Sequence, residues 1–151
     1  MGCGVNFGEV VFGNIGSARK RELTVIGDPV NVTARLESLT KEYGRELLIG
    51  PAAADLVREA YTLQFIDRLK VKGKMSALDL YSVVGLADEK REPALSSYLE
   101  IYERAQVALR GSAFAEAANL FRECLERQPE DKVAALHLER CRARLQRPGS
   151  L

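Results

Sequence analysis

Short apolar runs separated by glycines fill the first half of the chain. Runs of four or five residues that are rich in Val, Ile and Phe are typical of β-strands. We expect strands at residues 4–8, 9–13, 23–27, 46–50 and 80–84. Between them, residues 28–44 and 51–60 each carry a proline at or next to the start, as helices often do. The pattern therefore predicts an α+β domain over residues 1–86.

The longer of the two predicted helices has a defined start, end and buried face. Asp28 stands directly before Pro29, where its side chain could cap the first turn, and Gly44 is a residue type that commonly ends helices. The apolar side chains recur three and four residues apart, as expected for a helix packed on a sheet. They are Val32, Leu36, Leu39 and Tyr43.

The second half of the chain shows a different pattern. Residues 87–93 are charged, contain few apolar side chains and end in proline, which is typical of a linker. Beyond them, apolar residues recur at helical spacing, which predicts a helical region over residues 94–147. Its three helices are expected at residues 98–110, 113–127 and 131–145.

The order of small residues, aromatic residues and a closing proline in this helical region resembles a tetratricopeptide-type helix pair. The resemblance covers about one repeat and a following helix, and it implies a surface for a protein partner. A structural cap on the first half is the alternative. Cys124 and Cys141 are expected to pack between helices, and the single histidine, His137, to serve at the surface or in packing. The resemblance is carried by Ala105, Leu109, Gly111, Phe114, Ala117, Phe121, Leu125 and Pro129.

Composition narrows the classes of function that are open. The 22 Lys and Arg residues nearly balance 21 Asp and Glu residues, for a net charge of +1, which disfavours nucleic acid or anionic lipid as a partner. Three widely spaced cysteines favour a reducing, cytoplasmic setting over a disulfide framework. No apolar stretch approaches the roughly 20 residues of a membrane span. We therefore expect a cytoplasmic protein without a membrane span in this chain.

Asn31 and Arg35 are the first candidates for chemistry. They lie four residues apart on the predicted helix, so they share one face, away from the apolar stripe. An arginine offers a planar fork of donors to phosphate oxygens, and an asparagine both donates and accepts, so the two suit a sugar phosphate. The alternative is a solvated helix face with an incidental arginine.

Three sequence segments around Asn31 and Arg35 favour a binding site over an incidental surface pair. Residues 8–17 (GEVVFGNIGS), 21–37 (RELTVIGDPVNVTARLE) and 71–74 (VKGK) closely resemble the later part of the catalytic domain of class III adenylate and guanylate cyclases. The resemblance covers residues 1–86 and implies part of a ferredoxin-like α+β domain. The glycine run lacks the Gly-Lys-Ser or Gly-Lys-Thr ending of a phosphate-binding loop, and we expect it to form a hairpin.

The resemblance assigns roles to four residues. Family members join the ribose 3′ oxygen to the α-phosphate of a nucleoside triphosphate, with arginine stabilising the transition state and asparagine orienting the ribose. Arg35 and Asn31 stand at those positions. Thr24 matches the position that reads the base and favours ATP over GTP, although a strand threonine chosen for propensity is the alternative. Lys72 matches the lysine that holds the terminal phosphates; Lys74 could substitute, or either could be a solvated turn residue.

The resemblance also implies what the chain does not carry. Members use two Mg²⁺ or Mn²⁺ ions held by two aspartates in the first part of the domain, and no segment here matches either one. The family site forms between two catalytic domains, so the implied partner is a second cyclase domain, in a homodimer or as a complementing chain. A truncated gene, one fragment of a longer cyclase and a regulatory partner are all compatible with this gap; we favour truncation.

The sequence therefore predicts part of an adenylate cyclase that forms cyclic AMP and pyrophosphate from ATP, with guanylate cyclase less favoured. The isolated chain is expected to be inactive, or weakly active at most. A noncatalytic interaction module built on a cyclase remnant is the competing hypothesis. The helical tail, with Arg140 and Cys141 near its end, is similar to tails that follow cyclase domains in some bacterial multidomain sensors, which often have membrane-bound input domains upstream.

Overall fold

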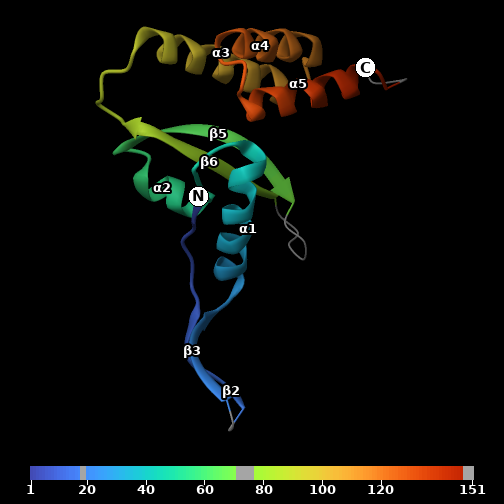
Figure 1. The fold of residues 1–151 in the computed structure, drawn as a ribbon. Helices are drawn as coiled ribbons and strands as arrows, with labels where there is room; N and C mark the ends of the chain where they lie inside the picture. The colour runs from blue at the N-terminus through green and yellow to red at the C-terminus, as the bar shows by residue number, and fades with distance from the viewer. Residues whose placement is uncertain (18–19, 71–76, 148–151) are drawn as a thin grey trace. The chain divides into compact units, whose positions relative to one another are not determined.

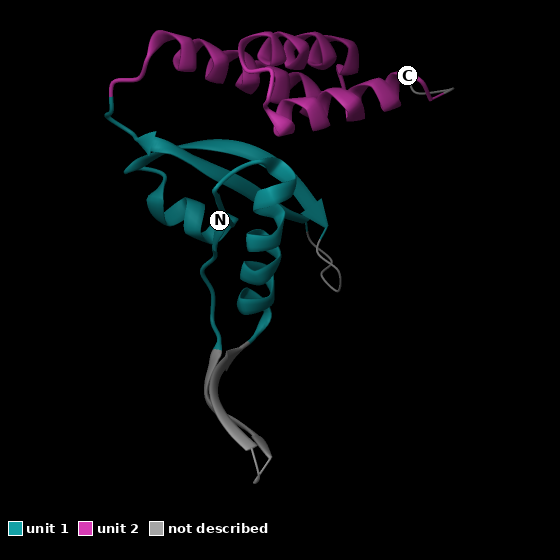
Figure 2. Ribbon diagram, viewed as in Figure 1, with its two compact units in different colours: residues 1–89 teal, residues 90–151 magenta. Residues whose placement is uncertain are grey.

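The computed structural model describes residues 1–17, 20–70 and 77–147, with side chains described outside 11–26. The chain divides into two compact units, Met1–Glu89 and Lys90–Leu151 (Figure 2). The boundary between them falls inside the segment for which the sequence predicts a linker. Within the described residues, no helix is long and apolar enough to cross a membrane.

The first unit is built on a four-stranded sheet with the order β1-β4-β6-β5. Strand β1 (Cys3–Val5) runs parallel to β4 (Leu47–Ile49), and β6 (Ala77–Leu86) is antiparallel to both β4 and β5 (Tyr61–Lys70) (Figure 1). A separate antiparallel pair is formed by β2 (Val11–Ser17) and β3 (Lys20–Ile26). The α+β class predicted for this half is confirmed.

Two helices cover opposite faces of this sheet. Helix α1 (Asp28–Tyr43) packs on the face of Gly4, where an added Cβ would lie 2.8 Å from Leu36 Cβ. The neighbouring Val5 lines an apolar hollow together with Ala53 from α2 (Pro51–Val57). Because successive strand residues point to opposite faces, α1 and α2 lie on opposite sides of β1.

The ends of α1 show one confirmed expectation and one correction. Gly44 adopts the left-handed conformation at φ 63°, and its N–H donates to the carbonyl of Thr40, so the helix ends as predicted. Asp28, however, is not the N-cap: it lies in the first turn, and the cap position is Gly27 at φ 143°, with no capping side-chain hydrogen bond. The chain enters α1 with a positive φ at residue 27, a conformation that glycine adopts readily. The backbone conformation therefore favours a glycine cap at this point, and Asp28 falls inside the helix.

Strand β5 is the main element that the pattern did not predict. Its pairing with β6 shifts register between Thr62 and Leu63 and again between Phe65 and Asp67. Residues 61–65 alternate between apolar and polar positions, and the alternation fails at the second shift, where Ile66 follows Phe65. The glycine run at residues 8–16 likewise supplies one strand of the β2–β3 hairpin and not the whole hairpin.

The second unit consists of three helices: α3 (Pro93–Arg110), α4 (Phe114–Arg127) and α5 (Lys132–Leu145). Its core is aromatic. Tyr102 meets Phe121 edge-on at 6.0 Å between ring centroids, and Phe121 stacks on His137 at 5.1 Å. His137 is 2% exposed, so it serves in packing, one of the two roles expected from the sequence.

Asp131 joins two of these helices. Its Oδ1 accepts hydrogen bonds from the backbone N–H groups of Val133 and Ala134 at the start of α5, and its Oδ2 accepts one from the hydroxyl of Tyr98 on α3. Asp131→Ala removes the cap and leaves the Tyr98 hydroxyl without its acceptor. We expect a loss of about 1–2 kcal/mol in the free energy of unfolding of this unit, measured by urea denaturation with circular dichroism.

Asp131→Asn is the matched control, because an amide oxygen still caps the helix, and it should lose clearly less stability than the alanine variant. Equal stability of Asp131→Ala and the wild type would contradict the capping role.

The three cysteines differ in reactivity. Burial raises the pKa of Cys124 to about 11 and raises that of Cys141 above its ordinary value, whereas Cys3 is exposed. At pH 8 the two buried thiols therefore stay protonated and shielded. We expect an aromatic disulfide reagent to titrate one thiol in the native chain and three after denaturation. Cys3→Ser should abolish the native reaction; two or more native thiols would show that the helical core is open.

Candidate active site

Asn31 and Arg35 lie on α1, one helical turn apart, and both are exposed. The residues between and beyond them on the opposite face, Val32, Leu36 and Leu39, are at most 2% exposed. The structure thus brings together the amide and the guanidinium that the sequence placed on a shared face. Their donors are directed at the surface of the unit and not into its core.

The start of α1 is tied to the segment that follows β1. The side-chain amide of Asn6 donates to the carbonyl of Pro29 at 3.2 Å, and the Thr33 hydroxyl donates to the same oxygen at 2.7 Å. Gly8 approaches the Pro29 ring so closely that an added Cβ would lie 2.4 Å from Pro29 Cγ. The first turn of α1, which carries Asn31, therefore has a fixed position relative to β1.

The other end of α1 is held by a buried hydrogen bond. The Tyr43 hydroxyl donates to Oδ2 of Asp67 on β5 at 2.7 Å, and Oδ1 of Asp67 accepts from the backbone N–H of Arg68 at 2.8 Å. Tyr43 and Asp67 are both buried. With both ends held, α1 presents Asn31 and Arg35 from a rigid support, which is the condition for a preorganised donor.

Asn6 and Asp67 were missed as contributors to the site. Nothing in the spacing of Asn6 distinguishes it from an ordinary loop asparagine, although its position between the strand and Gly8 is a weak signal of a turn. Asp67 lies on the strand that the pattern did not predict. Both act by supporting α1, and this role depends on contacts between residues far apart in the sequence.

The structure does not describe the side chains of the other two candidates, Thr24 and Lys72. Thr24 lies on β3 and is paired with Gly13 of β2, but its side chain is among those not described. Lys72 and its substitute Lys74 lie outside the described residues. The apolar hollow of the first unit, about 270 Å³ in volume, lies beside α2 and includes neither Asn31 nor Arg35 in its lining.

The described residues do not fit a divalent metal site. Mg²⁺ and Mn²⁺ take several oxygen ligands, most often from carboxylates. Across residues 1–10, 27–70 and 77–147, whose side chains the structure describes, no three His, Cys, Asp or Glu side chains come together in a group that could hold an ion. The acids nearest in sequence to the pair, Asp28 and Glu37, are both exposed on α1.

The close contact between β1 and α1 can be tested by a stability measurement that needs no activity assay. An added methyl at Gly4 would lie 2.7 Å from the backbone nitrogen of Glu37 and 2.8 Å from Leu36 Cβ, so Gly4→Ala forces the helix and strand apart. We expect a loss of about 1–3 kcal/mol in the free energy of unfolding of the first unit, measured by urea denaturation.

Gly111→Ala is the matched control for this substitution. Its added methyl would lie 3.5 Å from the nearest atom, the carbonyl oxygen of Val107, and its backbone has φ −82°, which any residue adopts. This variant should unfold at nearly the wild-type urea concentration. If Gly4→Ala behaves like Gly111→Ala, the proposed close packing of α1 on β1 is wrong.

Comparison with protein families gives one match over most of the first unit. The model of the family described as the adenylate and guanylate cyclase catalytic domain matches residues 1–85. The matched range includes Asn31, Arg35, Thr24 and Lys72 and ends just before the helical unit.

Two curated relatives illustrate how the chain aligns. It is 42% identical over 86 residues to the adenylate cyclase of Anabaena cylindrica, which covers 55% of this chain and 17% of that protein. It is 29% identical over 143 residues to the terminal-differentiation-specific adenylate cyclase of Dictyostelium discoideum, covering 93% of this chain and 7% of the relative. The chain thus spans less than a fifth of either relative, and the second alignment includes the helical unit.

Two solved structures of adenylyl cyclases also share similarity with this chain. The adenylyl cyclase CyaB from P. aeruginosa is 29% identical, with a TM-score of 0.45 and coverage of 57% of this chain and 41% of that chain. A bacterial light-regulated adenylyl cyclase is 33% identical, with a TM-score of 0.47 and coverage of 52% of this chain and 22% of that chain.

Proposed function

Because this chain belongs to the adenylate and guanylate cyclase catalytic domain family, we propose that it supplies the asparagine and arginine half of an adenylate cyclase active site. The observation that carries the proposal is the placement of Asn31 and Arg35 on the exposed face of one helix whose two ends are anchored. An incidental surface arginine needs no such support. The pair stands inside the matched range of the family.

The reaction is an intramolecular displacement at phosphorus. The ribose 3′ oxygen of ATP forms a bond to the α-phosphorus, the hydroxyl proton leaves to solvent, and the bond from the α-phosphorus to the oxygen bridging to the β-phosphate breaks. The products are cyclic AMP and pyrophosphate. Charge grows on the α-phosphate oxygens during this step, so a cationic donor already in place lowers the barrier.

Each residue of the pair has a distinct task in this step. The guanidinium of Arg35 donates to the α-phosphate oxygens as they gain charge, because its planar fork matches two oxygens at once. The amide of Asn31 holds the ribose so that the 3′ oxygen stays in line with the breaking bond, which is an orientation effect. The turn of helix between them lets one residue contact the sugar and the other the phosphate.

Two further residues complete the proposed contacts with ATP. Thr24 reads the base from β3, and Lys72 or Lys74 holds the terminal phosphates. The choice of ATP over GTP is supported by Thr24 and by the relatives named adenylate cyclases. A guanylate cyclase is the less favoured alternative.

The remaining requirements must come from a second cyclase domain. The metal ions, Mg²⁺ or Mn²⁺, would be held by its carboxylates, since the described residues of this chain do not gather a ligand set. A homodimer of the intact parent or a complementing chain would supply that domain. We propose a cytoplasmic site of action, and we expect the chain on its own to be inactive or nearly so.

Complementation tests this function directly. The chain is mixed with a cyclase chain that keeps its metal-binding aspartates but has lost its own asparagine and arginine, and cyclic AMP is measured with ATP and Mn²⁺. We expect product with the wild-type chain and a loss of about 10²- to 10³-fold with Arg35→Ala. Arg35→Lys keeps the charge but not the fork and should fall between the two.

Arg122→Ala controls for the loss of an exposed arginine, since Arg122 lies on α4 and bonds Asn119 of the same helix. It should support wild-type product formation. Absence of cyclic AMP in every mixture, or equal product from Arg35→Ala and Arg122→Ala, would contradict the catalytic proposal.

A noncatalytic interaction module is the second candidate. Its support is the helical unit, which is a compact body of three successive helices with its own aromatic core. In this alternative the cyclase unit is a scaffold and the helices bind a protein. The same mixtures decide between the two, because the module hypothesis predicts no product.

A further inference from the structure

Helix α1 begins without the local bonds that usually hold a first turn. Its cap residue is Gly27, and the helix has no capping side-chain hydrogen bond at this end. Pro29, two residues further on, has no backbone N–H to donate. The N–H groups of Val30 and Asn31 donate to the carbonyl of Gly27 at 3.1 and 3.3 Å. A helix end of this kind frays unless contacts from the rest of the protein hold it.

Asn6 holds this turn from outside the helix. Its amide nitrogen donates to the Pro29 carbonyl at 3.2 Å, across 23 positions of sequence. Its amide oxygen lies close to Gly50, the N-cap of α2, where an added Cβ would come within 2.6 Å of Oδ1. The N–H of Gly50 donates in turn to the carbonyl of Val5 at 3.0 Å. The Asn6 side chain therefore bridges the first turn of α1 and the turn that opens α2.

A second donor to the Pro29 carbonyl shows what is particular about Asn6. The Thr33 hydroxyl donates to the same oxygen at 2.7 Å, but Thr33 lies on α1 itself, four residues after Pro29. That hydrogen bond is local and moves with the helix. Of the two bonds, the one from Asn6 sets the position of the turn relative to the sheet.

Asn31 depends on this contact more than Arg35 does. At 1.5 Å of rise per residue, Asn31 lies about 3 Å along the helix axis from Pro29, and Arg35 lies about 9 Å away. Asn31 also precedes the first buried side chain of α1, which is Val32, whereas Arg35 stands between Val32 and Leu36, both buried. A loosened first turn would therefore displace the amide more than the guanidinium.

We propose that Asn6 is a positioning residue for the cyclase reaction and that it acts through Asn31. The inference rests on the function proposed above, in which the Asn31 amide orients the ribose. An orienting group that is slightly displaced reaches the reacting geometry less often, although the substrate still binds. Loss of the Asn6 contact should therefore lower kcat more than it weakens the binding of ATP.

Steady-state kinetics in the complementation mixture tests this role. Asn6→Leu keeps the size of the side chain and removes the donor without adding a charge. We expect kcat to fall about 10-fold, while KM for ATP changes by less than about two-fold. Thr33→Val, which removes the donor within the helix, should lower kcat clearly less. Asn119→Leu, a change at an exposed asparagine of α4, should leave both constants at their wild-type values.

Combined variants show through which residue Asn6 acts. In a chain that already carries Asn31→Ala, Asn6→Leu should cause no further fall in kcat, because the group to be positioned is gone. In a chain that carries Arg35→Lys, the loss caused by Asn6→Leu should persist. A general weakening of the fold would instead lower kcat in both backgrounds.

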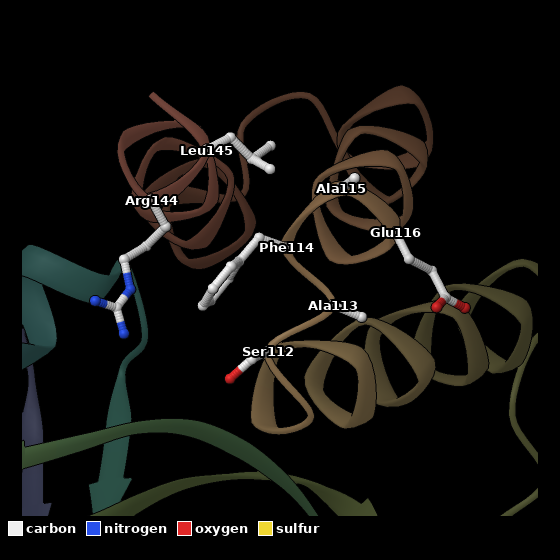
Figure 3. A pocket seen from close by; sticks show the side chains of 7 residues that line it. All are labelled: Ser112, Ala113, Phe114, Ala115, Glu116, Arg144 and Leu145. Atoms are coloured by element: carbon white, nitrogen blue, oxygen red, sulfur yellow. The ribbon is translucent and has the colours of Figure 1, made fainter. Parts of the chain in front are cut away.

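Hydrogen exchange tests the contact by a measurement that needs no activity assay. In Asn6→Leu, the backbone amides of residues 30–35 should exchange several-fold faster than in the wild type. The first turn of α4 is the internal reference, because it also begins without a capping side-chain hydrogen bond. It lies in the other unit, where the Arg144 guanidinium is 5.2 Å from the centroid of the Phe114 ring (Figure 3). Exchange in this turn should stay at the wild-type rate.

The outcomes separate this inference from the proposed function. Absence of cyclic AMP with the wild-type chain contradicts the proposed function, and unchanged exchange at residues 30–35 overturns the role of Asn6 in either case. With an active wild type, an undiminished kcat in Asn6→Leu, or a loss that adds to that of Asn31→Ala, overturns the positioning role alone.

Two further variants keep the test decisive. Asn6→Gln, which carries the donor on a longer side chain, should recover part of the lost kcat. If Asn6→Leu does not fold, Asn6→Asp takes its place, because an ionised aspartate has the shape of asparagine and cannot donate a hydrogen bond.

Discussion

The close approach of strand β1 to helix α1 is the constraint on which the first unit depends. At Gly4 the strand backbone and the helix are too near to admit a side chain, with Leu36 Cβ and the Glu37 nitrogen both within 3 Å of an added Cβ. The absence of a side chain at this position sets the distance between sheet and helix. The buried stripe of α1 then packs against the sheet without a gap.

Two polar contacts turn this packing into a fixed orientation. Asn6 binds the carbonyl of Pro29 at one end of α1, and Asp67 accepts from Tyr43 at the other. Apolar packing alone would allow a helix to slide or rotate slightly, whereas a buried hydrogen bond is costly to break without replacement. The directions in which Asn31 and Arg35 project from α1 are thus fixed by contacts in the core of the unit.

In the function proposed here, the anchored pair of donors on α1 forms one half of a composite site. The described part of the first unit offers a rigid cation and amide but gathers no cluster of carboxylates. If a second domain brings the carboxylates, association itself becomes a condition for chemistry, and anything that pairs two copies affects activity. The helical unit has a core of its own.

Local sequence determined much of this protein. The stripe on α1, its end at Gly44, the three helices of the second unit, and the shared face of Asn31 and Arg35 all follow from spacing, because a helix satisfies its backbone hydrogen bonds within one segment. The resemblance to the cyclase family could also be recognised from short segments of sequence.

Tertiary structure decided the rest. Strand β5 is defined by its pairing with β6, and only its first half, residues 61–65, carries the alternation of apolar and polar positions typical of a strand. The cap of α1 at Gly27 in place of Asp28, and the anchoring by Asn6 and Asp67, depend on the folded chain. A strand leaves its backbone groups to be satisfied by a distant segment, so its partner, register and supporting contacts are properties of the folded chain and not of the local pattern.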